Sequence, residues 1–185
     1  MRIKTPREKR ILYIKTIVRW ILYISIIFIS FTAMTIGTWK KPMLLVPVAL
    51  CIAINNDTML SAYTGALCGF LTDIACGRLF GYNAVLLTIF CTAVSLIYEL
   101  YLRKKFFNYL WITAIVSFIQ CWLDYKFYYE MWDYADVELI FTEYSFKIWI
   151  YTMISSVVIY LIFSIINKFL MPKEHLTIEE VIKSS

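Results

Sequence analysis

Long apolar stretches separated by short polar segments dominate the chain. Five of them approach the roughly 20 residues that a helix needs to cross a bilayer, and they cover residues 20–39, 58–76, 84–98, 106–123 and 148–166. A sixth, at 42–54, would be about 20 Å long as a helix, against a hydrocarbon core of about 30 Å. Pro47 interrupts it. It is therefore either a short or kinked span or a re-entrant segment.

Composition supports one polytopic membrane domain. Hydrophobic residues make up 61% of the 185 residues and charged residues 17%, against roughly 45–50% and 25% in soluble domains. A soluble or disordered chain would not carry so much apolar surface. We therefore expect an all-α bundle of six helices within residues 20–170. The first apolar stretch is long and lacks a following cleavage motif, so we expect it to be retained as a span.

The basic residues predict an orientation. With six crossings, the basic segment 1–19, the cluster 103–105 and the tail 171–185 lie on one side of the membrane, and this side holds most of the 18 Lys and Arg residues. The positive-inside rule makes that side cytoplasmic and places both termini there. If 42–54 did not cross, the cluster 103–105 would move outside, so six crossings are favoured. The basic residues left outside are Lys40, Lys41, Arg78, Lys126 and Lys147.

Residue types that carry chemistry are scarce. The single histidine, His175, lies in the polar tail, so no usual zinc ligand set can be built. No Gly-rich phosphate loop is present, and we expect no cofactor, no metal, no nucleic-acid partner and no catalysis. The five cysteines are scattered in apolar stretches, which argues against a disulfide framework: they are Cys51, Cys68, Cys76, Cys91 and Cys121.

The polar groups inside the spans are too few to predict a well-developed ligand pocket. Gln120 is the only side-chain amide well inside a span. Hydroxyl groups in spans usually bond to their own helix or to a neighbouring one. The hydroxyl-bearing residues that could line a pocket within the spans are Thr88, Thr92, Ser95, Thr113, Ser117 and Ser155.

A stripe of small residues is the most informative pattern. Gly65, Gly69, Asp73, Gly77 and Gly81 are each four residues apart, so on a continuous helix they form one slowly winding face. Gly65 and Gly69 have the spacing that lets two membrane helices approach closely. This face either packs inside the bundle or receives another polypeptide. The last two glycines fall in the segment 77–83 and suit a turn.

Asp73 is the only acid in the third apolar stretch. It would lie about 23 Å along a helix that starts near Thr58, close to the outer interface. There, water or Arg78 could compensate the charge of the Asp73 carboxylate. The alternative is that Asp73 contacts a partner or ligand directly. Asp57 is a candidate N-cap for the helix that starts at Thr58, and Asn83 for the next.

The segment 124–147 is acidic and aromatic. We expect it to form an extracytoplasmic loop that either lies on the bilayer surface or docks a partner. Glu130, Trp132 and Asp133 are the candidate partner residues.

Residues 39–84 resemble the MreD family, the rod shape-determining membrane proteins of the bacterial elongasome. The resemblance rests on Lys40-Lys41-Pro42 before a short second span, on Gly65-Ala66-Leu67-Cys68-Gly69-Phe70-Leu71-Thr72-Asp73, and on Gly77-Arg78-Leu79-Phe80-Gly81-Tyr82-Asn83-Ala84. It marks Pro42 as the start of the second span.

The resemblance implies a non-catalytic scaffold in the bacterial cytoplasmic membrane. Such a scaffold would bind an MreC-like bitopic protein, and with it a RodA-type glycosyltransferase and a penicillin-binding transpeptidase. It also implies a fold similar to the S-components of energy-coupling-factor transporters. A substrate-binding subunit of a small-molecule transporter is therefore the alternative function.

Overall fold

The computed structural model describes residues 6–36, 42–102, 105–132 and 141–170, and every regular element in these ranges is helical. The elements are α1 (Pro6–Ile36), α2 (Leu45–Asn55), α3 (Thr58–Cys76), α4 (Tyr82–Leu100), α5 (Phe106–Tyr128), the 3₁₀ turn η1 (Glu130–Trp132), the π-helical turn η2 (Phe141–Ser145) and α7 (Phe146–Leu170). The all-helical polytopic fold class is thereby confirmed, because five of the helices are long and apolar enough to cross a membrane.

The short helix α2 lies in the middle of the bundle. All of its residues from Leu45 to Ile54 are buried, and it touches α1, α3, α4, α5 and α7. A helix that is apolar all round must be buried all round. This explains why α2 can be only 11 residues long: its surface faces protein rather than lipid, so its length need not match the hydrocarbon core.

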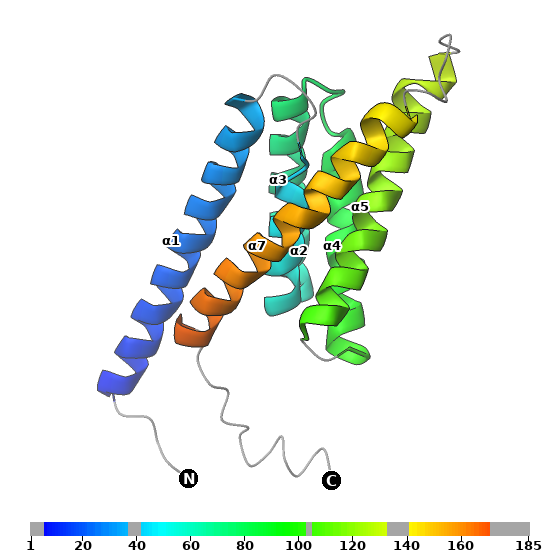
Figure 1. Cartoon of the computed structure of the whole chain (residues 1–185). Coiled ribbons are helices and arrows are strands. Elements are labelled where there is room, and N and C mark those ends of the chain that lie inside the picture. Colours follow the sequence, from blue (N-terminus) through cyan, green and yellow to red (C-terminus); the bar gives the residue numbers. More distant parts are fainter. Residues whose placement is uncertain (1–5, 37–41, 103–104, 133–140, 171–185) are drawn as a thin grey trace.

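The path of the chain connects the two ends of the bundle several times. In Figure 1, α1 ends at the upper end of the bundle and α3 begins at the lower end, so the segment that contains α2 joins opposite ends. The helices α3, α4, α5 and α7 then alternate in direction. As a result, α1 begins and α7 ends at the same end, which is called the terminal end below, and the α3–α4 turn lies at the other, the turn end.

Pro47 does not kink or interrupt α2, contrary to the sequence-based expectation. It is the third residue of the helix, where its missing N–H would have no intrahelical partner in any case. The preceding residues are held separately. The backbone N–H of Met43 donates to Thr152 Oγ1 of α7 at 3.0 Å, and the carbonyl of Pro42 accepts from the N–H of Leu44 at 2.9 Å.

Several helices extend beyond the predicted apolar stretches. The third has the predicted bounds, 58–76, but α1 begins at Pro6 rather than at Trp20, and α5 continues to Tyr128 rather than ending at Leu123. Similarly, α4 covers 82–100 and α7 covers 146–170. Hydropathy marks only the part of a helix that faces lipid or core. A helix can continue beyond that part through polar residues, as α5 does through Asp124, which pairs with Arg78. The predicted loop 124–147 is correspondingly shorter.

The outward surface of the bundle is apolar. Large hydrophobic side chains on every long helix are exposed, including Phe28 at 63%, Val85 at 61% and Ile154 at 61%. A soluble protein would hide such a surface. The bundle therefore has the exterior of a multi-pass membrane protein, with a protein-packed interior around α2.

Candidate functional site

The glycine face of α3 packs against α4 of the same chain. A Cβ atom at Gly69 would lie 2.3 Å from Ala84 Cα and 2.5 Å from the Asn83 carbonyl oxygen. A Cβ atom at Gly65 would lie 2.8 Å from the Leu87 carbonyl oxygen. Of the two interpretations of this stripe, the structure supports packing inside the bundle. Because α4 fills the groove, no other polypeptide can occupy it while the two helices are packed.

The other two glycines shape the turn between α3 and α4. Gly77 ends α3 with φ +62°, and Gly81 precedes α4 with φ +98°. Both angles lie in the left-handed region, which side chains other than glycine adopt at a cost. The N–H of Gly77 donates to Ile74 O and that of Arg78 to Asp73 O, which satisfies the last carbonyls of α3. The chain thus reverses within five residues, 77–81.

Asp73 holds the start of α4. It is 1% exposed, and its carboxylate accepts from the backbone N–H of Gly81 at 2.8 Å, the backbone N–H of Asn83 at 3.2 Å and Asn83 Nδ2 at 2.8 Å. The first N–H groups of a helix lack intrahelical partners, and a carboxylate there also meets the positive end of the helix dipole. Asp73 of α3 therefore caps α4. The sequence suggested the Arg78 side chain as the partner of Asp73, and that suggestion was wrong.

Asn83 connects the capping carboxylate of Asp73 to α5. It lies inside α4, two residues after the N-cap position held by Gly81, so it is not the helix cap that we predicted. Its side chain donates to Asp73 and accepts from Gln120 Nε2 at 2.8 Å. All three side chains are buried. Gln120, the side-chain amide that the sequence places well inside a span, therefore connects α5 to the α3–α4 turn.

Arg78 forms a second connection to α5. Its guanidinium is paired with the carboxylate of Asp124, whose side chain is only 5% exposed, and lies 5.3 Å from the ring centroid of Tyr128. The Tyr128 hydroxyl accepts from the backbone N–H of Leu79 at 3.0 Å. Burial is the largest single influence and lowers the pKa of Arg78, but the Asp124 carboxylate together with the other groups around the guanidinium outweighs it, so the net pKa lies above the ordinary arginine value. Arg78 therefore stays charged.

Four buried polar side chains and the partly exposed Arg78 form one group, which we call the turn clamp: Asp73, Arg78, Asn83, Gln120 and Asp124. The ring of Tyr82 stacks on Phe127 with centroids 4.9 Å apart and closes the same contact between α4 and α5. On the outer face of the clamped turn, Leu79 is 61% exposed and Phe80 is 69% exposed. The clamp therefore presents two large apolar side chains on a rigid turn.

The sequence missed the pairing in the clamp because it joins distant residues. Asp124 was expected in a loop, whereas it lies in α5, buried and 46 residues from its partner Arg78. The only signal was that acids inside or next to membrane helices usually have a partner. Arg78 is close to Asp73 along the chain, so the sequence suggested a contact between Arg78 and Asp73 instead of the pair Arg78–Asp124.

The other predicted residues lie apart from the clamp. Asp57 holds the N-cap position of α3, but its side chain accepts no capping hydrogen bond. Glu130 is in η1 and pairs with Lys126 at 3.2 Å, four residues earlier. Trp132 ends η1, and Asp133 lies outside the described residues. The docking role of Glu130, Trp132 and Asp133 stays a prediction.

The hydroxyl groups of the spans mostly bond to backbone, as predicted. Thr88, Thr92 and Ser155 donate to carbonyls of their own helices, and Ser95 donates to the Asn56 carbonyl. Within the described residues, Thr113 and Ser117 have no side-chain hydrogen-bond partner.

Asp73 should matter to stability more than any exposed acid does. Removing a buried charged acceptor leaves its donors unsatisfied, at about 1.5–3 kcal/mol for each charge-assisted bond. We expect Asp73→Ala to lower the thermal midpoint in detergent strongly, and Asp73→Asn, which keeps one acceptor, to lower it less. Asp57→Ala is the matched control, because that exposed carboxylate makes no capping bond. An Asp73→Ala midpoint equal to that of the control would contradict the capping role.

The described residues combine an apolar exterior, a buried central helix and a polar clamp that fixes one turn. They contain no group of three or more His, Cys, Asp or Glu side chains that could hold a metal ion. These features define a polytopic α-helical membrane protein with a structural polar site.

Residues 12–173 match the family model described as rod shape-determining protein MreD, so the chain belongs to the MreD family of shape-determining membrane proteins. No curated protein and no solved structure matches the chain, so the similarity to transporter S-components stays a prediction.

Proposed function

We propose that this protein is a non-catalytic membrane scaffold that binds an MreC-like bitopic protein at the turn end of the bundle. Through that partner it helps to organise the RodA-type glycosyltransferase and the penicillin-binding transpeptidase of wall elongation. Membership of the MreD family supports the shape-determining role. The observation that carries the proposed docking position is the exposure of Leu79 and Phe80 on a turn that the clamp holds rigid.

A rigid apolar turn favours binding because little conformational entropy is lost when it docks. The turn is fixed from both sides, by Asp73 in α3 and by the Arg78–Asp124 pair to α5. Phe80 also packs on Phe70, with ring centroids 5.0 Å apart, which holds its ring in one place. Large aromatic side chains on a rigid support are typical of binding hot spots.

We further propose that the turn end is extracytoplasmic and that both termini are cytoplasmic. At the terminal end, the basic side chains Arg10, Lys15 and Lys168 outnumber the acids Asp57 and Glu99 among the described side chains. At the turn end, Lys126 and Lys147 are instead neutralised by their partners Glu130 and Glu143. Basic residues favour the cytoplasmic side. The turn and residues 130–138 of the predicted loop 124–147 would then face the compartment in which the wall is built.

The docking position can be tested by partner recovery. The double variant Leu79→Ser/Phe80→Ser removes the exposed apolar pair without touching the clamp. We expect it to lower the amount of MreC-type protein that co-purifies with the tagged chain about thirtyfold, the scale of one hot-spot residue of about 2 kcal/mol. Phe107→Ser is the matched control, because Phe107 is 72% exposed at the terminal end.

Both variants must first be shown to fold, by thermal midpoints equal to that of the unaltered chain. Recovery that is unchanged in the Leu79→Ser/Phe80→Ser variant, or equally reduced in the control, would contradict docking at this turn. Removal of residues 130–138 tests separately whether that segment adds to the same contact.

A further inference from the structure

A cavity of about 360 Å³ opens at the terminal end of the bundle, away from the turn clamp. Residues of α2, α4, α5 and α7 line it, together with Lys105, the residue before α5. Its volume is in the range of small-molecule sites, about 300–1,000 Å³. Nothing in the scaffold function described above requires such a cavity.

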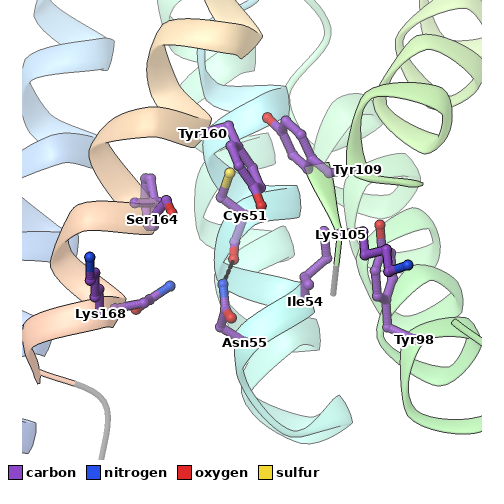
Figure 2. A pocket seen from close by; sticks show the side chains of 11 residues that line it. Cys51, Ile54, Asn55, Tyr98, Lys105, Tyr109, Tyr160, Ser164 and Lys168 are labelled. Atoms are coloured by element: carbon purple, nitrogen blue, oxygen red, sulfur yellow. Dashed lines mark hydrogen bonds between the residues drawn. The ribbon is translucent and has the colours of Figure 1, made fainter. Parts of the chain in front are cut away.

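The mouth of the cavity is positively charged. Figure 2 shows Lys105 and Lys168 on opposite sides of it, on segments far apart in the sequence. None of the lining residues is acidic. In the described part of the chain, the salt bridges involve neither of these lysines. Two cations that face one cavity without a counter-charge favour an anionic occupant.

Polar groups with unused hydrogen-bonding capacity lie in the wall. Tyr98 is 6% exposed, and its hydroxyl is buried without a partner among the described residues. A buried hydroxyl left unpaired lowers the stability of the fold, so such a group calls for a ligand or a water molecule. The side-chain oxygen of Asn167 accepts from the Tyr23 hydroxyl. That bond orients the amide and leaves its NH₂ group available as a donor.

The deeper wall is apolar and aromatic. It includes Ile54, Tyr109, Tyr160 and Phe163, and the rings of Tyr109 and Tyr160 lie 4.9 Å apart between centroids. Figure 2 shows these two rings beside Cys51, farther into the bundle than Asn55 and Lys168. The cavity is thus cationic at its mouth and apolar inside.

We propose that this cavity binds a phosphate ester carried on an apolar group, with the phosphate in the mouth that Lys105 and Lys168 flank and the apolar part against Tyr109, Tyr160 and Phe163. The Tyr98 hydroxyl, which belongs to the side of the mouth that carries Lys105, would donate a further hydrogen bond to the phosphate. The cavity opens at one end of the spans, the depth at which lipid phosphates lie, so a membrane lipid can reach it. This assignment is independent of partner docking at the opposite end of the bundle.

The test measures lipid retention by native mass spectrometry of the full chain. The protein is released from mixed micelles titrated with phosphatidylglycerol, with phosphatidylcholine as the reference lipid. We expect saturable retention of one phosphatidylglycerol. Lys105→Ala/Lys168→Ala should weaken it about tenfold or more, since each lysine near a lipid surface contributes about 1 kcal/mol. Lys105→Arg/Lys168→Arg should preserve it, and Tyr98→Phe should weaken it several-fold.

The matched control is Arg10→Ala/Lys15→Ala. It makes the same change in net charge at the same end of the bundle, on α1 and outside the cavity. Retention that persists in Lys105→Ala/Lys168→Ala, or that falls equally in the control, would overturn the proposal. Should the lysine variant fail to fold, Ser164→Trp fills the cavity from its exposed wall without a change in charge. Retention undiminished by Ser164→Trp would also overturn the proposal.

A second arm identifies the source of the phosphate. Glycerol 3-phosphate and inorganic phosphate are added at millimolar concentration to the lipid-bound protein. Displacement of phosphatidylglycerol identifies a water-soluble phosphate compound as a competing occupant, and no displacement identifies the lipid. Both results are interpreted only for retention that Lys105→Ala/Lys168→Ala weakens, and the absence of any saturable retention would exclude the phosphate site.

Discussion

Gly69→Ala is expected to destabilise the bundle more than any other single-methyl addition to α3. The new Cβ atom would lie 2.3 Å from Ala84 Cα, 2.5 Å from the Asn83 carbonyl oxygen and 2.6 Å from the Ala84 nitrogen. All three are backbone atoms of α4, so no side-chain rotation can relieve the overlap. Overpacking of this kind costs about 1–3 kcal/mol, occasionally more, and the shift of α4 would also disturb its cap at Asp73.

The control for this prediction is Ala93→Val, which adds bulk to an exposed position of α4. We expect its thermal midpoint in detergent to equal that of the unaltered chain, while that of Gly69→Ala falls by several degrees. A Gly69→Ala protein that keeps its midpoint but loses its partner would contradict the account. In that event the glycine face would belong to the partner interface and not to the contact between α3 and α4.

Arg78→Ala is expected to destabilise the bundle strongly. It leaves the Asp124 carboxylate buried without its partner, and breaking a buried ion pair in this way costs about 3–5 kcal/mol. Replacing both partners with apolar residues, as in Arg78→Met/Asp124→Leu, removes the uncompensated charge. We therefore expect the double variant to be more stable than Arg78→Ala. Thermal and denaturant unfolding of the purified protein provide the measurement.

The surface pair Lys126–Glu130 is the matched control for this effect. Both of its side chains are about half exposed, so Lys126→Ala should cost no more than about 1 kcal/mol. Equal losses for Arg78→Ala and Lys126→Ala would show that the Arg78–Asp124 pair is not a buried clamp. A double variant no more stable than Arg78→Ala would show that the loss does not come from an unpaired carboxylate.

The sequence predicted the helical class and the bounds of α3, because local signals mark them. Thr58 follows a polar turn, and Gly77 has the backbone freedom that ends a helix. The central position of α2 was not predictable in the same way. Hydropathy scores a residue identically whether it faces lipid, as the 59% exposed Ile24 does, or protein, as the fully buried Ile52 does. Only the packing of the other helices distinguishes the two.

The candidate site was predicted in part. Four-residue spacing correctly brought Gly65, Gly69 and Asp73 to one face, because helical periodicity alone fixes that relation. The partner of Asp73 was predicted wrongly, since its carboxylate turns to the N–H groups of Gly81 and Asn83 across the turn. Contacts between residues in different helices depend on how those helices cross, which no local pattern specifies.

In the proposed function, the clamp supports a rigid turn whose outer face receives the partner. The most direct measurement is the molar ratio of MreC-type protein to folded chain in complexes isolated from cells that carry Leu79→Ser/Phe80→Ser. The account predicts a sharply reduced ratio at an unchanged thermal midpoint, together with loss of rod shape. A ratio equal to that of the unaltered chain would contradict it.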